Sequence, residues 1–228
     1  MASQSLNSSF STSCRNIRIG DMAPDFTAKT TQGKISFHEF KKGYWSILFS
    51  HPEDFTPVCT TELGAVAKLS KEWALRGCLP IGLSCNTLDS HAAWIADINE
   101  TQNADVTYPI IADADRKVAT LYGMLDKKDS GNVDNLGMPL TVRSVFIVDP
   151  KNIVRLILTY PSSTGRNFQE VLRVLDSLQL TDKRKVYTAA SWVPGQDVII
   201  PPSLSQRDAE LLFPGHTVIK PYLRTTSL

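Results

Sequence analysis

The sequence has no long apolar run and no excess of charge of one sign. No stretch approaches the roughly 18 apolar residues that a membrane-spanning helix needs. Lys and Arg number 24 against 23 Asp and Glu, so the net charge is +1 and no basic surface for nucleic acid is indicated. Neither a transmembrane segment nor a nucleic-acid partner is therefore expected. The hydrophobic content of 42% in 228 residues is typical of a globular protein.

Cysteine is also scarce, at four residues: Cys14, Cys59, Cys78 and Cys85. This number is too small for a disulfide-stabilised scaffold, so we expect a reducing compartment and mostly free thiols. No pair forms a CxxC motif, which disfavours a disulfide oxidoreductase, and no pair lies at zinc-site spacing beside two histidines. The sequence therefore predicts no metal and no cofactor.

Acidic side chains are missing from residues 1–16, which are rich in Ser. We interpret this segment as a disordered tail, because one Arg and few apolar residues make a poor amphipathic helix. A transit peptide shares the same compositional bias, so a targeting segment is the alternative. The predicted location is the cytoplasm, with the mitochondrion as the alternative.

Residues 17–180 alternate between short apolar runs and helical patterns, which indicates an α/β domain with some antiparallel pairing. Turn signals occur at Gly20-Asp21, at Gln32-Gly33 and over 149–152. Strands are predicted at 44–50, 78–85, 143–150 and 152–160, and helices at 57–77, 90–100 and 166–180. Residues 181–228 differ in composition and are rich in Pro, so we predict a smaller C-terminal module there.

A lone thiol stands at the start of the helix predicted over 57–77. Thr56 suits the N-cap position, and Pro57 suits the first helical position, where its missing N–H costs nothing. Cys59 then lies in the first turn, where unpaired backbone N–H groups and the positive end of the helix dipole favour a thiolate. Because the thiolate is the nucleophilic form, the spacing predicts an activated cysteine with the Thr56 hydroxyl within reach.

A buried structural cysteine at a helix start is the alternative to a reactive one. Pro52 and Pro57 stand on either side of the loop that leads into the helix. Prolines stiffen a loop, which is useful where a reactive group must be held in place. They favour the functional interpretation of Cys59.

The segment "HPEDFTPVCTTELG" resembles the active-site loop of the peroxiredoxins, whose pattern is Pro-x-x-x-Thr-x-x-Cys. Pro52, Thr56 and Cys59 match that pattern. "RIGDMAPDF" and "PLTVRSVFIVDP" are similar to other segments of the family, and "ASWVPGQDVIIPPSLSQRDAELLFP" is similar to its one-cysteine, peroxiredoxin-6-like subfamily. The resemblance covers nearly the whole chain after residue 17. It implies a thioredoxin-like fold, with a mixed central sheet flanked by helices over 17–180 and a C-terminal module over 181–228 that makes dimer contacts.

The resemblance implies a catalytic role for three residues. Cys59 matches the peroxidatic cysteine, which attacks a peroxide oxygen and becomes a sulfenic acid. Thr56 matches the threonine that hydrogen-bonds both the sulfur and the peroxide. Arg143 matches the arginine that stabilises the thiolate and the charge developing on oxygen. An arginine suits this role because it is always charged and donates in a fixed fork.

The resemblance also implies four neighbouring roles. Pro52 matches the proline that shields the intermediate from water, and His51 matches a histidine close to the sulfur in this subfamily. Glu62 and Arg166 match buried residues that orient the arginine network. From the residues alone, the alternative for His51 is a capping or core histidine.

No cysteine follows Cys85, so the second thiol of two-cysteine peroxiredoxins is absent from its place in the C-terminal region. Cys78 and Cys85 flank "LPIGLS" and are expected to be buried at strand ends. We therefore expect one-cysteine chemistry with an external reductant, either a thiol of the glutathione or thioredoxin type or ascorbate. Without a quick partner, Cys59 would be prone to oxidation to sulfinic acid.

One segment departs from some relatives, in which a Gly-x-Ser-x-Gly-type motif is associated with phospholipase A2 activity. Here Gly43 is followed by Tyr44, Trp45 and Ser46, so the serine is missing from its position. His38 matches the histidine of that triad, but a histidine without its serine has no nucleophile to activate. The sequence predicts no phospholipase activity by this route.

The leading hypothesis is a thiol-dependent peroxidase, acting on hydrogen peroxide and organic hydroperoxides, including lipid hydroperoxides, as a homodimer. The alternative is a peroxide sensor or chaperone-like dimer, in which oxidation of Cys59 changes binding instead of clearing peroxide. Both need the same activated cysteine. The number of catalytic cycles per subunit distinguishes them.

Overall fold

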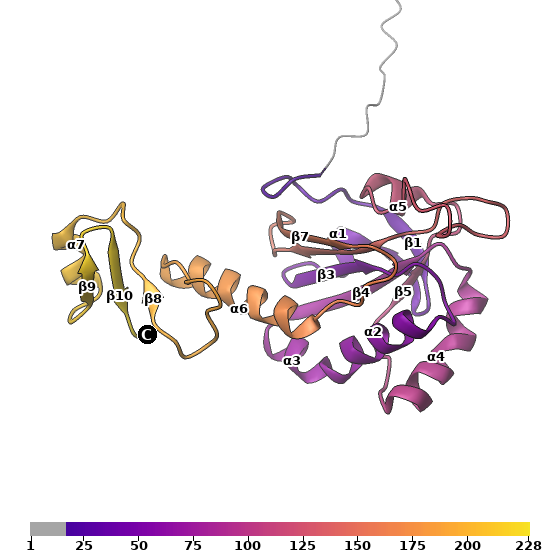
Figure 1. Cartoon of the computed structure of the whole chain (residues 1–228), viewed down its shortest axis with the longest axis horizontal. Helices are drawn as coiled ribbons and strands as arrows, with labels where there is room; N and C mark the ends of the chain where they lie inside the picture. Colours follow the sequence, from indigo (N-terminus) through magenta and orange to yellow (C-terminus); the bar gives the residue numbers. More distant parts are fainter. Residues whose placement is uncertain (1–16) are drawn as a thin grey trace, which may run out of the picture.

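The computed structural model describes residues 17–228, so the predicted tail and Cys14 lie outside the described residues. The main body is built on a seven-stranded sheet in the order β2-β1-β5-β4-β3-β6-β7 (Figure 1). Its strands are β1 (Thr27–Thr30), β2 (Gly33–Ser36), β3 (Trp45–Ser50), β4 (Cys78–Ser84), β5 (Ile110–Ala112), β6 (Arg143–Val148) and β7 (Val154–Tyr160). Parallel pairing joins β3, β4 and β5, and the other pairs are antiparallel. The predicted mixed α/β sheet is confirmed.

Helices cover both faces of this sheet. They are α1 (Phe37–Phe40), α2 (Pro57–Lys68), α3 (Ser70–Leu75), α4 (Leu88–Gln102), α5 (Lys117–Leu121) and α6 (Phe168–Arg184). One core cluster joins the sheet to α2, α3, α4 and α6, and a second joins it to α1 and α5. Every residue of the central strands β3 and β6 is consequently buried, which explains their continuous apolar runs.

The helix predicted over 57–77 is wrong in one respect, because it is divided at Leu69. In an unbroken helix the carbonyl of Val66 would accept a bond from residue 70. Here it accepts bonds from the N–H of Leu69 and from the indole Nε1 of Trp73, at 3.2 and 3.0 Å. The indole of the buried Trp73 thus occupies a carbonyl that would otherwise accept a bond within the helix, and this contact joins α3 to α2. Gly77 follows α3 with a φ of +55°, as expected of a glycine stop.

Helix α6 continues beyond its predicted end at residue 180 to Arg184. The two basic residues of its last turn, Lys183 and Arg184, favour this extension because they face the negative end of the helix dipole. The expected boundary between 180 and 181 therefore falls inside α6. Among the described residues, no helix is both long enough and apolar enough to cross a membrane.

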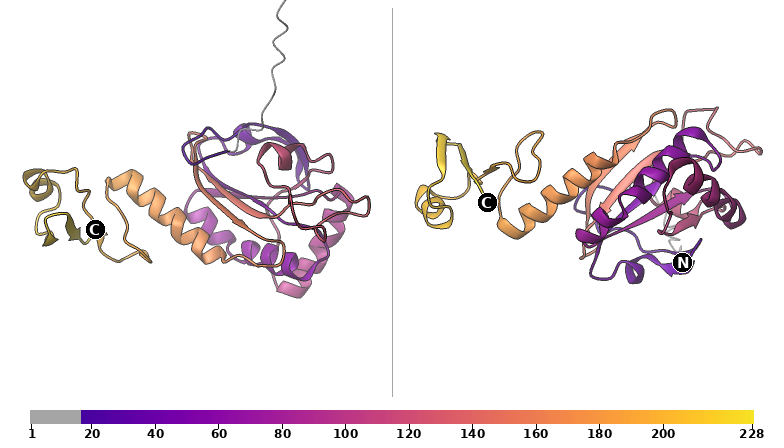
Figure 2. Two further views of the ribbon diagram at one scale, coloured as in Figure 1. Left: turned by 45° about the horizontal axis from the view of Figure 1, so that its top comes forward. Right: turned by 90° about the horizontal axis from the view of Figure 1, so that it is seen from below.

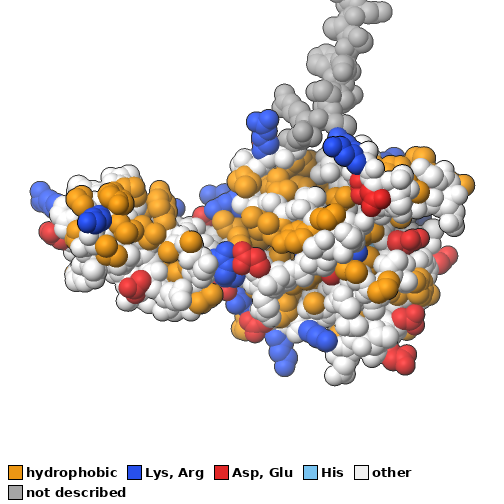
Figure 3. All heavy atoms as spheres, in the orientation of Figure 1, with side chains coloured by type: hydrophobic (Ala, Val, Ile, Leu, Met, Phe, Trp, Pro, Cys, Tyr) orange, Lys and Arg blue, Asp and Glu red, His pale blue; other side chains and the backbone are white. Residues whose placement is uncertain are grey.

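The C-terminal residues form a separate small unit at the far end of α6, apart from the main body (Figures 1 and 2). It contains α7 (Gln206–Leu212) and a three-stranded sheet of β8 (Val198–Ile199), β10 (Leu223–Thr226) and β9 (Thr217–Lys220). Its own buried cluster is small, namely Val186, Trp192 and Val198. Hydrophobic side chains also gather on its surface (Figure 3). Those exposed by half or more are Tyr187, Leu211, Leu212, Val218, Ile219, Tyr222 and Leu228.

Candidate active site

The helix start around Cys59 has the predicted geometry. Thr56 is the N-cap residue with an extended backbone, Pro57 is the first residue of α2 and Cys59 is the third. The Cys59 side chain is fully buried against the sheet, in the cluster that also holds Leu63. The sulfur therefore lies in the first turn of the helix, where backbone N–H groups have no partner within the helix.

The Thr56 side chain is expected to lie within reach of the sulfur, and this stays a prediction. Its hydroxyl donates to the carbonyl oxygen of Glu53 at 2.8 Å and makes no capping bond to the helix. The hydroxyl is thus held within the loop that precedes α2. Phe55, just before it, has a φ of +56°, which is unusual for a bulky residue and is typical of functional loops.

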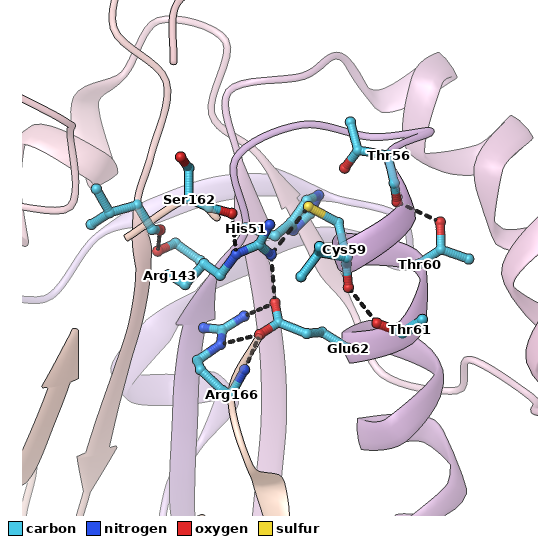
Figure 4. A network of polar contacts seen from close by, with 12 residues as sticks. His51, Thr56, Cys59, Thr60, Thr61, Glu62, Arg143, Ser162 and Arg166 are labelled. Carbon is cyan, nitrogen blue, oxygen red and sulfur yellow. Dashed lines mark hydrogen bonds and ion pairs between the residues drawn. The ribbon is translucent and has the colours of Figure 1, made fainter. Parts of the chain in front are cut away.

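Arg143 brings its guanidinium to the sulfur from the first residue of β6. Its Nη1 lies 3.3 Å from Cys59 Sγ and 2.7 Å from Glu62 Oε2, while its Nε donates to the carbonyl of Ser162 at 2.7 Å (Figure 4). Three acceptors therefore hold one buried side chain in place. The sequence signalled Arg143 and Glu62, but nothing in it pointed to the backbone contact at Ser162.

Glu62 joins the two arginines of the site. Its carboxylate accepts bonds from Arg166 N, Nε and Nη2 at 2.7, 2.9 and 2.7 Å, in addition to the bond from Arg143. Burial alone would raise the pKa of Glu62, but the hydrogen bonds and charge of Arg166 and the charge of Arg143 hold it below its ordinary value. Glu62 is therefore an ionised carboxylate between two guanidinium groups.

Arg166 is fixed on its other sides as well. Its Nη1 donates to the carbonyl of Ser144 at 2.8 Å. The guanidinium carbon lies 5.6 Å from the ring centre of Phe49 and 5.2 Å from that of Phe168. Cation–π contacts of this kind stabilise the charge of a buried arginine, in addition to its ion pair with Glu62. Arg166 can thus orient Glu62, and through it Arg143.

His51 follows β3 and is fully buried, and Pro52 next to it is also buried. Its Nε2 lies 2.8 Å from Asp54 Oδ1, whereas its Nδ1 has no hydrogen-bond partner among the described residues. Asp54 Oδ2 lies 2.7 Å from Nδ1 of a second buried histidine, His91 of α4. Sequence reasoning missed Asp54 and His91, since the two lie 37 residues apart and meet only through packing of α4.

Among the described residues, the ring nitrogens of His51 and His91 and the carboxylate of Asp54 lie close enough together to hold a metal ion. We assign them to hydrogen bonding instead. The separations of 2.8 and 2.7 Å are donor–acceptor distances, and each joins a ring nitrogen to a different carboxylate oxygen of Asp54. We call His51, Asp54 and His91 the His–Asp–His cluster.

The other described cysteines lie away from this chemistry, as expected. Cys78 begins β4 and Cys85 directly follows it, and both are buried free thiols. Burial raises the pKa of Cys78 to about 12 and that of Cys85 to about 11, so both are protonated and unreactive at neutral pH.

The segment discussed for phospholipase activity contains no serine–histidine pair. The Ser46 hydroxyl is buried and donates to the carbonyl of Leu79 at 2.8 Å. His38 Nε2 lies 2.8 Å from the carbonyl oxygen of Ala23. The expectation that no phospholipase acts by this route therefore stays a prediction, and it is consistent with these contacts.

Comparison with known families identifies the chain. Residues 19–157 match the AhpC/TSA family, and residues 177–212 match the C-terminal domain of 1-Cys peroxiredoxin. The fold and the buried cysteine–arginine site thus define a thiol-dependent peroxidase on a thioredoxin-like fold. The chain belongs to the AhpC/TSA family, in its one-cysteine peroxiredoxin branch.

Individual relatives agree with this assignment. The chain is 52% identical over 211 residues to a mitochondrial peroxiredoxin of Saccharomyces cerevisiae, covering 92% of this chain and 80% of the relative. It is similar to the crystal structure of a cysteine-to-serine variant of peroxiredoxin 6 from Arenicola marina, with a TM-score of 0.89 and 44% identity over 93% of this chain and 98% of that one. A structure of the yeast mitochondrial 1-Cys peroxiredoxin, which describes thiol resolution via glutathione/thioredoxin systems, gives a TM-score of 0.85 and 49% identity, covering 93% of this chain and 100% of that one.

The contacts of Arg143 predict the effect of replacing it. In Arg143→Lys, a single ammonium cannot donate to the sulfur, to Glu62 and to Ser162 in the same fork geometry. We expect the second-order rate constant with hydrogen peroxide to fall by roughly 100- to 1,000-fold. Stopped-flow fluorescence measures it. Arg155→Lys, which alters an ion pair with Asp182 outside the site, is the matched control and should leave the rate unchanged. A full rate in Arg143→Lys would contradict the assignment.

Proposed function

We propose that the protein reduces hydrogen peroxide and organic hydroperoxides with Cys59 as the peroxidatic cysteine. The observation that carries this proposal is the Arg143 Nη1 to Cys59 Sγ distance of 3.3 Å at the first turn of α2. The thiolate attacks one peroxide oxygen, an S–O bond forms and the O–O bond breaks. Water or an alcohol leaves after taking up a proton, and Cys59 becomes a sulfenic acid.

The remaining site residues have supporting roles in this proposal. Arg143 and the backbone N–H groups of the helix start stabilise negative charge on sulfur and on the leaving oxygen. Glu62 and Arg166 orient Arg143, and the buried Pro52 keeps water from the sulfur. The Thr56 hydroxyl donates to the carbonyl of Glu53, so its oxygen can accept a hydrogen bond from the O–H of the peroxide.

Recycling is proposed to use an external reductant. The described cysteines Cys78 and Cys85 are buried at the ends of β4, which supports a reductant from outside the chain. The yeast relative is described with glutathione/thioredoxin systems, so a thiol of that type is our first choice, with ascorbate as the alternative. Attack of a thiolate on the sulfenic sulfur would form a mixed disulfide and release water.

The test is mass spectrometry after a brief pulse of hydrogen peroxide, which locates the thiol that gains oxygen. We expect one oxygen on Cys59 after a short pulse and two oxygens after a longer one without reductant. Cys78 and Cys85 should remain unmodified. Oxygen on another cysteine while Cys59 stays reduced would contradict the proposal.

Turnover distinguishes the peroxidase from a peroxide sensor or chaperone-like dimer. With excess peroxide and glutathione, a peroxidase consumes many peroxides per subunit, whereas a sensor stops after one. We expect many cycles, because the chain belongs to a family of thiol-dependent peroxidases. Antioxidant defence is the corresponding role in the cell.

Homodimers are typical of the family, and we propose that the C-terminal module makes dimer contacts here. Its exposed apolar side chains and its small core support this, because a large apolar surface on a small unit is usually covered. In sedimentation velocity, Ile219→Lys should shift the dimer towards monomer. Leu75→Lys replaces an exposed leucine of the main body and should leave the dimer intact. Equal effects of the two would contradict the proposal.

The location is proposed to be the mitochondrion. The Ser-rich segment 1–16 without acidic residues and the yeast mitochondrial relative both support this choice over the cytoplasm.

A further inference from the structure

The His–Asp–His cluster is a buried polar group that the reaction described above does not use fully. All three side chains are nearly or completely inaccessible to solvent. Asp54 accepts bonds from both histidines and also from the Ser90 hydroxyl, which lies 2.7 Å from Oδ2. Burial alone would raise the pKa of Asp54, but these two histidines lower it, so the carboxylate is ionised.

Both ring nitrogens of His91 face hydrogen-bond acceptors. Nδ1 lies 2.7 Å from the Asp54 carboxylate, and Nε2 lies 3.2 Å from the carbonyl oxygen of Ile111. Both partners are acceptors, since a carbonyl and an ionised carboxylate have no proton to donate. Each ring nitrogen must therefore carry a proton if both bonds are to form. The ring of His91 is then an imidazolium paired with Asp54.

The contacts of His51 lead to the opposite state. Its Nε2 must donate to Asp54, while its buried Nδ1 has no partner among the described residues. A second proton on Nδ1 would be buried without an acceptor, which is costly. Burial lowers the pKa of His51, the Asp54 carboxylate raises it, and the charges of His91 and Arg166 lower it, with the net shift downwards. His51 is thus neutral, with a lone pair on Nδ1.

The strand register places the His51 side chain on the side of the sheet that carries the peroxidatic sulfur. Phe49 of β3 is opposite Val145 of β6, and both belong to the core cluster that contains Cys59. Side chains two residues apart along an extended chain lie on one face. His51 therefore lies on the Cys59 face after Phe49, and Arg143 lies there before Val145.

We propose that His91 is a further positioning residue of the peroxidase site. As an imidazolium, His91 neutralises the charge of the Asp54 carboxylate. That carboxylate then does not stabilise a second proton on His51, so His51 offers Nδ1 only as a hydrogen-bond acceptor. The acceptor suits the O–H of an incoming hydroperoxide or of the Cys59 sulfenic acid. This inference rests on the proposed function of Cys59 but concerns a residue of α4 that does not contact the sulfur.

Nuclear magnetic resonance of the full chain labelled with ¹⁵N-histidine tests the proton arrangement directly. Imidazole nitrogens with and without a proton are distinguished by their shifts, and loss of signals in His51→Asn and His91→Asn assigns them. At neutral pH we expect both nitrogens of His91 and only Nε2 of His51 to be protonated. A neutral His91, or a proton on Nδ1 of His51, overturns the proposal.

The pH profile of peroxidase activity tests the consequence for the site. His91→Asn keeps a donor near Asp54 but removes the positive charge, so the pKa of His51 should rise. As the pH is lowered, the ring should then become protonated at a higher pH than in the wild type. Relative to the wild type, the rate of His91→Asn should fall about tenfold or more between about pH 8 and pH 5. Ser90→Ala removes only a neutral donor and should keep the wild-type profile. Superimposable profiles for His91→Asn and the wild type overturn the proposal.

A second variant tests the proposal even if His91→Asn does not fold. In Asp54→Asn the charge that would hold a second proton on His51 is absent, so no loss of rate towards low pH beyond that of the wild type should appear. The histidine signals should show a mixture of His51 tautomers. A new loss of rate at low pH in this variant overturns the proposal. The resonance experiment needs no turnover, so a failure of the proposed peroxidase activity would be recognised separately from a failure of this inference.

Discussion

Replacing Cys59 by serine should reduce peroxidase activity to the uncatalysed background. The hydroxyl of the introduced serine stays protonated at neutral pH and attacks the O–O bond poorly, although it fits the same space at the third residue of α2. Arg143 and Glu62 would remain in place, so the loss would report the sulfur and not the fold. Consumption of hydrogen peroxide coupled to glutathione oxidation measures it.

Two controls separate this effect from a general loss of thiols. Cys14→Ser and Cys78→Ala should keep their activity, because Cys14 precedes the peroxidase domain in the sequence and Cys78 is a buried thiol at the start of β4. Cys78→Ala can lower stability by removing a buried atom, which thermal unfolding would show separately. Residual turnover in Cys59→Ser near the wild-type level would contradict the assignment of the nucleophile.

The second large effect is expected on stability, from Glu62→Gln. This change leaves Arg143 and Arg166, two buried guanidinium groups, without the carboxylate that they share. Removing one partner of a buried ion pair costs about 3–5 kcal/mol, so the free energy of unfolding should fall by that amount. Urea denaturation monitored by circular dichroism measures it. Glu72→Gln, which alters a half-exposed pair with Arg76, should cost about 1 kcal/mol or less.

The same carboxylate predicts a dependence of stability on pH. Because the pKa of Glu62 is lowered in the folded protein, its ionised form contributes stability at every pH above its ordinary value of 4.5. That contribution is lost as the pH falls below 4.5 through the lower folded value. The difference in unfolding free energy between the wild type and Glu62→Gln should therefore shrink below that pH. A constant difference down to the acid transition would contradict the role of the charge.

Local patterns were sufficient for most of the fold. The apolar runs that became β3 and β6 are buried on both faces, and the Thr-Pro-x-Cys spacing placed Cys59 in the first turn of α2. The division of the helix at Leu69 was not predictable in this way. It depends on the indole of Trp73 reaching back to the carbonyl of Val66, which is a contact between side chain and backbone and has no periodic signature.

The site shows the same difference between motif and packing. Cys59 and Thr56 could be found from a short motif, and Arg143, Glu62 and Arg166 from a resemblance spread over the chain. Asp54 and His91 could not be found, because a carboxylate in a loop and a histidine on a helix are common in any sequence. Their meeting depends on how α4 packs beside the loop after β3.

The shared carboxylate also has a consequence for the redox cycle of the sulfur. In the proposed reaction, the reduced sulfur acts as a thiolate, and the thiolate and Glu62 together balance the guanidinium groups of Arg143 and Arg166. Conversion of the sulfur to neutral sulfenic acid leaves one positive charge in excess inside the protein. That excess attracts an anionic thiol reductant, but a second oxidation to sulfinate restores neutrality equally well. The same excess of positive charge therefore favours both reduction by a thiol and oxidation to sulfinate. The supply of reductant determines which of the two occurs.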